Sequence, residues 1–431
     1  MFNKNFQKRI LLLIYFIFFI NSKKVVFPFK EIEINSTLYV NDTNFFYNQI
    51  YLNNIYTKIK IGNPDQLILA TFNSENTHLI IKDIPKLYNI EGYNTYNYLN
   101  SQKTFKNITS QNEENTITKG YSIINETIKI YKDKDYKKTA EIKDFQLELL
   151  NKFDYNDKTK TLSGEIGLSN ENSKISFIKQ LLNQKIIDSE IITINYNSDN
   201  NGYISLGESP DKIDKEKPIV MNKSFDGSLF QIEMDYVYMN HKGGRTFFSD
   251  TNLVFYFEQG IILASDGYQN TVYKYFFQER INKGLCFEEN IYFNIDDYTA
   301  IICKEKADIS NFPKLNFEIN DKTFSLDYKD LFQKVNDIYY FLIVFSPEIK
   351  NWVIGKPFLK KYQLTFDNNK NEVFFIKNSS KSSKAWVAVL VIIIIIIILI
   401  IALFLFYRYK MRQKSENDYF DSAKGPLLGK I

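Results

Sequence analysis

The chain is poor in the residues and motifs that most enzyme classes require. Its 431 residues include only two histidines, His78 and His241, and neither stands near a cysteine or a paired carboxylate motif. Two such isolated imidazoles make a poor metal site, so we expect surface or turn residues and no bound metal. The sequence also has no Gly-rich phosphate loop, no G-x-S-x-G elbow and no Cys and His pair suited to nucleophilic catalysis. We therefore expect no cofactor.

An excess of one sign of charge is also missing. Lys and Arg number 54 and Asp and Glu number 50, which gives a net charge of +4. No basic stripe is suited to following a phosphate backbone. Nucleic acid is therefore not an expected partner.

Cysteine is scarce as well. The only two are Cys286 and Cys303. An isolated even pair in an oxidising compartment predicts one disulfide, and two buried free thiols are the alternative.

Large apolar residues, in contrast, are abundant. The chain holds 37 Phe, 30 Tyr and many Ile. These residues favour pleated, half-buried surfaces, so we expect mostly β structure. An AT-rich genome would raise the same residues together, so their abundance alone says little about function.

Two hydrophobic segments predict the topology. Residues 1–22 have the layout of a secretory signal peptide, with basic residues, a short apolar run and a polar end. Residues 385–406 carry no charge and are long enough to cross about 30 Å of hydrocarbon, so we expect a transmembrane helix after a juxtamembrane linker at 378–384. Basic residues open the tail, 407–431, which predicts a cytosolic C-terminus and a single-pass type I orientation. The ectodomain would be lumenal or extracellular, and the sequence leaves open which membrane holds it.

Glycosylation sequons support a lumenal ectodomain, although several are expected by chance in an Asn-rich chain. They occur at Asn35, Asn41, Asn107, Asn125, Asn222 and Asn378.

Between the two hydrophobic segments, short β-rich runs alternate with Asn, Asp, Gly and Lys clusters. Apolar spacing predicts packing helices at 174–184 and 271–281. Charge, proline and turn formers gather at 208–218, which we take as the connection between two halves. The predicted N-terminal β lobe is 45–212 and the C-terminal β lobe is 213–377.

One stretch resembles the first strand pair of a known family. Residues 56–66 read YTKIKIGNPDQ, which is similar to the Y-x-x-x-I-x-I-G-T-P-P-Q of pepsin-like (A1 family) eukaryotic aspartic proteases. The family then has h-h-F-D-T-G-S-S, with the first catalytic aspartate. Here Asn73 stands at the aspartate position, followed by Ser74 and Glu75.

Three further blocks follow in the family's order. Residues 163–168 (SGEIGL) resemble D-G-I-L-G-L, residues 175–207 follow the family's helix and strands, and residues 352–367 resemble W-I-L-G-D-x-F-L-R-x-Y-Y-x-V-F-D. Cys286 and Cys303 lie where the C-terminal lobe of the family commonly has a disulfide. The resemblance implies an all-β, bilobal pepsin-like fold with a few short helices.

The second catalytic position is harder to align. Residues 261–267 read IILASDG against the family's h-h-D-T-G-[TS]-S, so an ungapped alignment places Ala264 at the aspartate, followed by Ser265 and Asp266. A one-residue shift would bring Asp266 into the site instead. At most one half would then be acidic.

These substitutions bear directly on the chemistry that the resemblance implies. Aspartic proteolysis needs two carboxylates that share one proton. An amide at Asn73 has no titratable proton, and Ala264 lacks polar atoms altogether. Glu75 and Asp266 could serve as displaced acids, but the reaction tolerates only small misplacements, so solvated loop charges are the expected reading.

The flap region departs from the family too. Where the family has I-T-Y-G-T-G-S, this chain has Lys119 at the flap tyrosine, followed by Gly120 and Tyr121. Tyr121 could take the tyrosine's role after a local shift, although strand packing is its expected use.

The sequence therefore predicts a membrane-anchored pseudo-protease whose inter-lobe cleft can still bind a peptide or protein, since strand-like peptide binding needs no catalytic dyad. One alternative is an active aspartic endopeptidase that works at acid pH. Another is an adhesive or structural surface protein.

Overall fold

The structure is a computed structural model, and the contacts divide the chain into a compact unit of residues 1–378 and a second unit of residues 379–431. The predicted signal peptide, the linker at 378–384 and part of the predicted membrane segment lie outside the described residues. The structure describes residues 23–31, 43–51, 55–82, 106–108, 121–132, 137–150, 164–169, 173, 175–197, 200–208, 219–223, 230–241, 244–248, 251–293, 296–377, 396–397 and 399–411.

Residues 396–397 and 399–411 of the second unit are helical. Within the described ranges, no helix is both long and apolar enough to span a bilayer.

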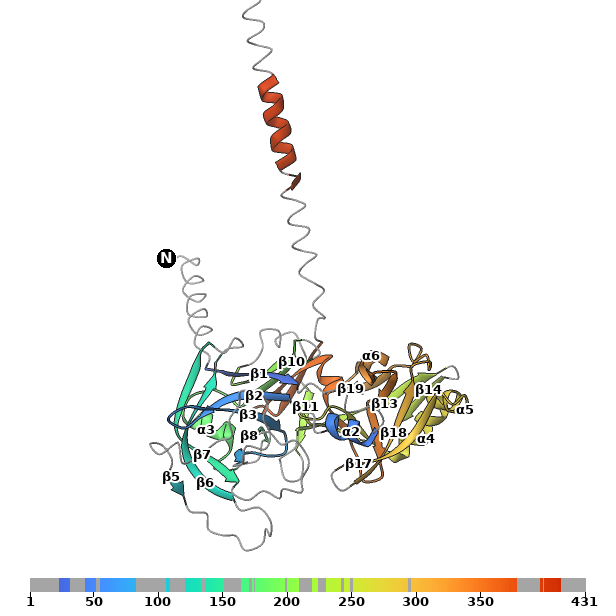
Figure 1. Cartoon of the computed structure of the whole chain (residues 1–431), viewed down its shortest axis with the longest axis horizontal. Coiled ribbons are helices and arrows are strands. Elements are labelled where there is room, and N and C mark those ends of the chain that lie inside the picture. The colour runs from blue at the N-terminus through green and yellow to red at the C-terminus, as the bar shows by residue number, and fades with distance from the viewer. Residues whose placement is uncertain are drawn as a thin grey trace, which may run out of the picture. The chain divides into compact units, whose positions relative to one another are not determined.

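The first unit is mostly β structure, as predicted, and its first half alternates short strands with two helices (Figure 1). The elements of this half are β1 (Val25–Glu31), α2 (Thr43–Tyr51), β2 (Ile55–Ile61), β3 (Gln66–Asn73), β4 (Leu79–Lys82), β5 (Lys106–Ile108), β6 (Tyr121–Tyr131), β7 (Thr139–Leu150), β8 (Gly164–Gly167), α3 (Phe177–Asn183), β9 (Ile191–Tyr196) and β10 (Asn201–Leu206).

The second half adds more strands and several short helices. Its elements are β11 (Ile219–Lys223), β12 (Phe230–Met234), β13 (Tyr236–His241), β14 (Gly244–Phe248), β15 (Thr251–Phe255), β16 (Ile262–Ser265), η4 (Asp266–Tyr268), α4 (Gln269–Val272), the π-helical turn η5 (Tyr273–Phe277), α5 (Gln278–Asn282), β17 (Cys286–Phe293), β18 (Asp296–Lys304), β19 (Leu315–Ile319), β20 (Lys322–Leu326), α6 (Tyr328–Leu331), β21 (Phe332–Val335), β22 (Ile338–Phe341), β23 (Ile343–Ser346), β24 (Trp352–Ile354), α7 (Lys356–Leu359), β25 (Tyr362–Asp367) and β26 (Glu372–Lys377).

The strands form because apolar and polar residues alternate along them. In β2, Ile55, Ile59 and Ile61 are buried while the lysines between them stay partly exposed, which is the pattern of a strand with one face on the core. Thr57 also points inward, and its hydroxyl donates to the carbonyl of Pro28 at 2.8 Å. A buried polar group is tolerated there because it has a partner.

Both predicted packing helices are present, with different boundaries. The first is α3, which is shorter than 174–184 because Ser176 caps its N-terminus by accepting from the amide of Lys179. The second is a run of α4, η5 and α5 over residues 269–282.

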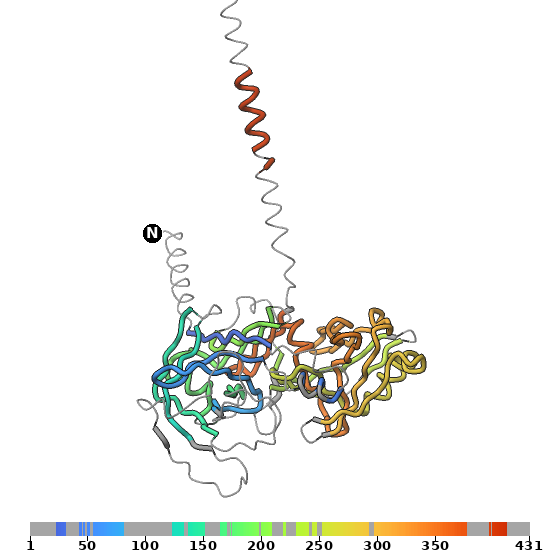
Figure 2. Tube along the Cα trace, viewed as in Figure 1, coloured from blue at the N-terminus to red at the C-terminus, as the bar shows by residue number. Residues whose placement is uncertain are grey.

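The two halves are not separate sheets. The C-terminal strand β25 pairs with β9 of the first half and with β26, and β26 pairs with β11, which continues into β12 of the second half. In Figure 2 the C-terminal part of the chain accordingly runs beside the green strands of the first half. The predicted second lobe, 213–377, therefore donates two strands to the sheet of the predicted first lobe.

Each half contains the same arrangement of four strands. In the first half, β8 pairs in parallel with β3 and antiparallel with β4, and β4 pairs in parallel with β7. In the second half, β24 pairs in parallel with β15 and antiparallel with β16, and β16 pairs in parallel with β23. This internal repeat defines which residues of the two halves correspond.

The cysteine prediction is confirmed. Cys286 and Cys303 lie directly opposite each other on β17 and β18 and form a disulfide with an S–S distance of 2.04 Å.

Candidate functional site: two facing loops

The loop after β3 carries the first predicted catalytic position. Asn73 ends β3 opposite Gly167 of β8. An added Cβ at Gly167 would lie 2.5 Å from the backbone of residues 76–78, so only glycine lets the strand approach the loop this closely. This packing fixes the backbone on which Asn73 is held.

The side chain of Asn73 is used inside its own loop. Its Oδ1 accepts from the amides of Glu75 and Asn76, at 2.8 and 3.0 Å, and its Nδ2 donates to Oε1 of Glu165 at 2.9 Å. Asn76 Nδ2 donates to the same Glu165 oxygen at 3.1 Å. An amide held in this way shapes the loop but has no proton to exchange in acid–base catalysis.

The strand register corrects the prediction for the second position. Phe255 of β15 pairs with Ile354 of β24, as Phe72 pairs with Ile166 in the first half. The next residue, Tyr256, lies beside Gly355 and donates its amide to the carbonyl of Ile354 at 3.0 Å. Tyr256 therefore corresponds to Asn73.

Gly355 completes the match with the first half. A Cβ there would lie 2.4 Å from the carbonyl oxygens of Gln259 and Ile261, which correspond to Asn76 and His78. The family-like block around Trp352 thus packs on the 256–259 loop, as the block around Gly164 packs on the first loop.

The predicted residues Ala264, Ser265 and Asp266 lie elsewhere. Ala264 is buried in β16 and corresponds to Ile81, because it pairs with Phe345 of β23 as Ile81 pairs with Leu149 of β7. Ser265 ends β16, and Asp266 is exposed at the start of η4, so the shifted alignment is wrong as well. The alignment was wrong because two apolar strands, β15 and β16, flank the loop at 256–259. The sequence Ser-Asp-Gly, which looks like the family's turn, follows β16, whereas the loop that corresponds to the first one follows β15.

The sequence alone does not single out the correct loop. A Phe-x-x-Glu pattern is common to both loops, as Phe72 to Glu75 and Phe255 to Glu258, but it also occurs at 230–233, 276–279 and 345–348. Glu258 is the functional-site residue that the sequence analysis missed.

Glu258 reaches across to the first loop. Its carboxylate accepts from Ser74 twice, from the amide N–H at 3.3 Å and from Oγ at 3.0 Å. Burial raises the pKa of Glu258 to about 7, the hydrogen bonds from Ser74 oppose the shift, and the charge of Glu75 adds to it.

A second contact crosses between the loops in the opposite sense. The hydroxyl of Tyr256 donates to Oε1 of Glu75. Burial is the main cause that raises the pKa of Tyr256, and this hydrogen bond adds to it, so the phenol stays protonated. The two loops therefore exchange contacts, with the glutamate of each accepting from the other.

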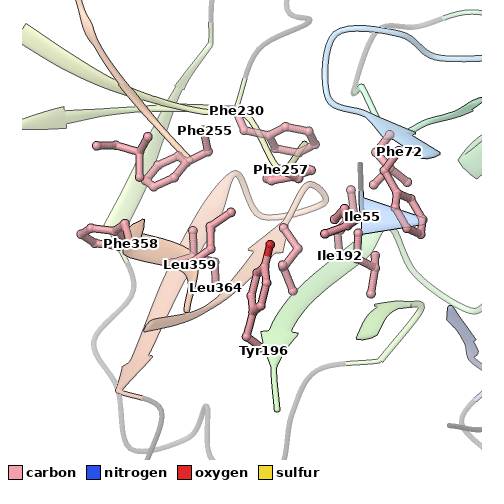
Figure 3. Packing of buried hydrophobic residues seen from close by; sticks show 14 of the residues in the cluster. Ile55, Phe72, Ile192, Tyr196, Phe230, Phe255, Phe257, Phe358, Leu359 and Leu364 are labelled. Carbon is pink, nitrogen blue, oxygen red and sulfur yellow. The ribbon is translucent and has the colours of Figure 1, made fainter. Parts of the chain in front are cut away.

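Phe257, the counterpart of Ser74, takes no part in this polar exchange. Figure 3 shows it beside Phe230. It is fully buried, and its ring centroid lies 4.9 Å from that of Phe230 and 5.5 Å from that of Phe366. The second loop is thus anchored by an aromatic cluster, whereas the first is anchored by hydrogen bonds.

Helix α2 packs on strands of the second half and is hydrogen-bonded just after the second loop. In Figure 1 it lies beside β17 and β18, far along the chain from its own residues. Phe46 stacks on Tyr340 at 3.7 Å, Tyr47 donates its hydroxyl to the carbonyl of Phe341 at 2.8 Å, and Gly260 donates its amide to the carbonyl of Ile50 at 2.8 Å. Although most of α2 falls in the predicted N-terminal lobe, 45–212, its side chains belong to the core of the second half.

The remaining predicted site residues are only partly described. Lys119, Gly120, Asn35, Asn41 and Asn378 lie outside the described residues. Tyr121 begins β6 opposite Leu150, while Asn107 and Asn222 lie on β5 and β11, and none of these three side chains is described. Asn125 lies on β6 with its Oδ1 buried. Glycosylation stays a prediction at all six sequons.

Over the part of the chain that the structure describes, no group of three or more His, Cys, Asp or Glu side chains is arranged to hold a metal ion.

A β unit with two pseudo-symmetric loops facing each other is the architecture of a bilobal acid protease. The family model for eukaryotic aspartyl proteases matches residues 54–377. The chain belongs to the eukaryotic aspartyl protease family. A comparison of the sequence with curated proteins found no match.

Proposed function

We propose that the protein is a family member without aspartic-type hydrolysis that acts as a peptide- or protein-binding ectodomain on a membrane. The observation that carries this proposal is the pair at the corresponding loop positions, Asn73 and Tyr256. Neither residue has a carboxyl group, so no shared-proton dyad forms there.

The nearby acids do not restore the dyad. Both oxygens of Glu258 accept hydrogen bonds from Ser74, and Glu75 accepts from Tyr256. These bonds aim the carboxylates at the opposite loop's protein groups, whereas a general base must aim at a bound water or substrate. We infer that the carboxylates of Glu75 and Glu258 hold the two loops together.

Membrane attachment belongs to the proposal as well. The apolar segment 385–406, the basic residues after it and the signal-like segment 1–22 support a type I orientation with the ectodomain in the lumen or outside the cell. Glycans at the sequons would fit this orientation.

Binding without hydrolysis would use the chain's β architecture, since a peptide can be held as an added strand by backbone hydrogen bonds. Binding to the detergent-solubilised full chain can be tested with a photo-crosslinking peptide library. Crosslinks at residues 73–76 or 256–259 would support binding between the loops. Crosslinks only at distant surfaces would favour the adhesive alternative.

A second candidate is an active endopeptidase that uses Glu75 and Glu258. The specific observation in its favour is that the charge of Glu75 adds to the effect of burial, the main cause, in raising the pKa of Glu258, so the two carboxylates interact. Such coupling is a property of acid dyads, although it also occurs in structural pairs.

Proteolysis of a randomised peptide library from pH 3 to 7 distinguishes these candidates. The full-length chain in detergent is compared with Glu258→Gln, with Asp266→Asn as a matched control in an exposed acid, and with an active aspartic protease assayed in parallel. We expect no cleavage by the unmodified chain. Cleavage that a statine-type inhibitor blocks, and that Glu258→Gln abolishes while Asp266→Asn does not, would overturn the proposal.

A further inference from the structure

Three side chains outside the facing loops form a continuous hydrogen-bonded series. His78 Nδ1 lies 2.7 Å from Oε1 of Glu148, and His78 Nε2 lies 2.8 Å from Oγ of Ser173. The three residues are remote in sequence, so the fold rather than a local motif brings them together. No local sequence motif therefore marks these residues.

Strand pairing places the acid beside the histidine. His78 immediately precedes β4, and β4 pairs in parallel with β7, with Ile80 opposite Glu148. The backbone of His78 is fixed at both ends, since its amide donates to Asn76 Oδ1 at 3.1 Å and its carbonyl accepts from the amide of Gly167 at 2.8 Å. The imidazole is therefore held on a rigid part of the first half.

The hydroxyl is placed by the start of α3. Ser173 accepts at its carbonyl from the amide of Ser176, the N-cap of α3, at 3.2 Å. Among the described residues, no acceptor is found for the amide N–H of Ser173 itself. In the site proposed below, this N–H is the donor to a ligand that binds at the hydroxyl.

The order of contacts determines what the histidine can do. If Nδ1 carries the proton and donates to Glu148, Nε2 has its lone pair directed at Ser173 Oγ, which then donates to it. His78 and Glu148 retain 21% and 18% side-chain exposure, so the group is shielded but reachable from solvent. Within the described chain, His78 is the only partner found for the Glu148 carboxylate.

We propose that Ser173, His78 and Glu148 form a serine-nucleophile site that hydrolyses small acyl esters. The nitrogen facing the carboxylate and the nitrogen facing the hydroxyl are those that a Ser–His–acid triad requires. Ser173 is the nucleophile, His78 is the general base, and Glu148 is a positioning residue that orients the imidazole.

The reaction balances without any further reagent than water. Ser173 Oγ attacks the ester carbonyl carbon while its proton passes to His78 Nε2, and the amide of Ser173 donates to the developing oxyanion. The carbon–alkoxy bond breaks and the alcohol leaves with the proton from His78. Water, deprotonated by His78, then cleaves the acyl-serine to give the carboxylic acid and the free hydroxyl.

This site is chemically distinct from the facing loops. It uses a nucleophile and a base near neutral pH, whereas an acid dyad acts through a water molecule at low pH. Statine-type compounds would inhibit hydrolysis at the facing loops, whereas fluorophosphonates label an activated serine. A negative result at one site therefore does not affect the interpretation of the experiment on the other site.

The first experiment treats the unmodified full-length chain in detergent with a fluorophosphonate probe and maps the adduct by mass spectrometry. We expect the label at Ser173, together with p-nitrophenyl acetate hydrolysis that increases as pH rises from 5 to 8, as a reaction with a general base requires. No adduct at Ser173 over this range would overturn the proposal. This measurement does not depend on whether a variant folds.

Variants then assign the roles. Ser173→Ala should remove hydrolysis above the background rate, and His78→Gln should lower it about 100-fold or more. Ser265→Ala, a serine of the second half with no role in this site, should leave it unchanged. Hydrolysis that persists in Ser173→Ala would show that the activity lies elsewhere.

The positioning role of Glu148 needs a readout other than rate. Glu148→Gln should lower the rate at least about 10-fold and move the pH–rate midpoint downward, because a neutral amide stabilises the imidazolium less than a carboxylate does. A rate loss without a change of midpoint would contradict the role assigned to Glu148.

Discussion

The two halves of the first unit build the same backbone with different side chains. The loop after β3 presents Asn73, Ser74 and Glu75, and the loop after β15 presents Tyr256, Phe257 and Glu258. The first is held by polar contacts within the loop, and the second by packing of Phe257 into the aromatic core. Their common geometry therefore does not depend on a common set of loop side chains.

What the halves share is a glycine at the end of a strand that packs directly against the loop backbone. Gly167 and Gly355 lie against loop backbone so closely that no Cβ fits. The chemistry of the loops can then change while their shape stays, which is how a protease fold can lack the protease dyad. The following predictions test this comparison, beginning with the largest expected effect.

Removal of the Phe46 side chain should cost the most. Phe46 is fully buried on α2 and stacks on Tyr340 of the second half, so Phe46→Ala should lower the free energy of unfolding by about 3 to 5 kcal/mol. Denaturant unfolding of the full chain in detergent measures this loss. Phe247→Ala is the matched control, because Phe247 is 53% exposed and its removal should change stability far less. Equal losses would mean that α2 is not part of the second half's core.

The paired glycines should respond alike. Gly167→Ala and Gly355→Ala each push a methyl group into backbone at 2.5 and 2.4 Å, so each should cost about 3 kcal/mol. Gly267→Ala is the control, since its Cβ would meet only Ser265 Oγ at 3.6 Å. A large loss at one glycine and none at the other would break the proposed correspondence of the halves.

The disulfide lies in the second half, where it joins β17 to β18. Replacing Cys286 and Cys303 together by serine should cost about 2 to 3 kcal/mol, because the unfolded chain regains the entropy of an open loop. The melting temperature of the double variant, compared with that of the oxidised unmodified chain, measures this loss, and the reduced unmodified chain should melt with the variant. A double variant as stable as the oxidised protein would contradict this account.

Much of the fold could be read from the sequence. The block around Gly62 and Pro64 and the block around Trp352 carry enough scaffold residues to predict a bilobal β fold, and Asn73, the residue aligned with the first catalytic position, ends β3. The second loop was misplaced because Tyr256 and Phe257 keep none of the residue types expected there. Only the pairing of β15 with β24 could show which apolar strand leads to it.

Long-range side-chain contacts could not be predicted from the sequence either, because they too depend on how the strands pair. The hydrogen bonds from Ser74 to Glu258 and from Tyr256 to Glu75 join residues more than 180 positions apart in the chain. Spacing along a sequence carries no information about such pairs. For the same reason, the sequence did not reveal the packing of α2 on the second half. It also did not reveal the hydrogen-bonded series from Glu148 through His78 to Ser173.

The smallest predicted effect separates the two loop glutamates by pH. Since burial raises the pKa of Glu258 from 4.5 to about 7, the folded state binds its proton more tightly than the unfolded chain does. That contribution to stability is fully present below about pH 4.5 and is lost as pH rises through 7, by roughly 2 kcal/mol after allowance for partial exposure. Unfolding free energies of the full chain at pH 4 and pH 8 should therefore show a loss that Glu258→Gln removes and Glu75→Gln largely keeps. If Glu258→Gln retains the full pH dependence, the carboxylate of Glu258 is not buried between the loops and the exchange of contacts described for them fails.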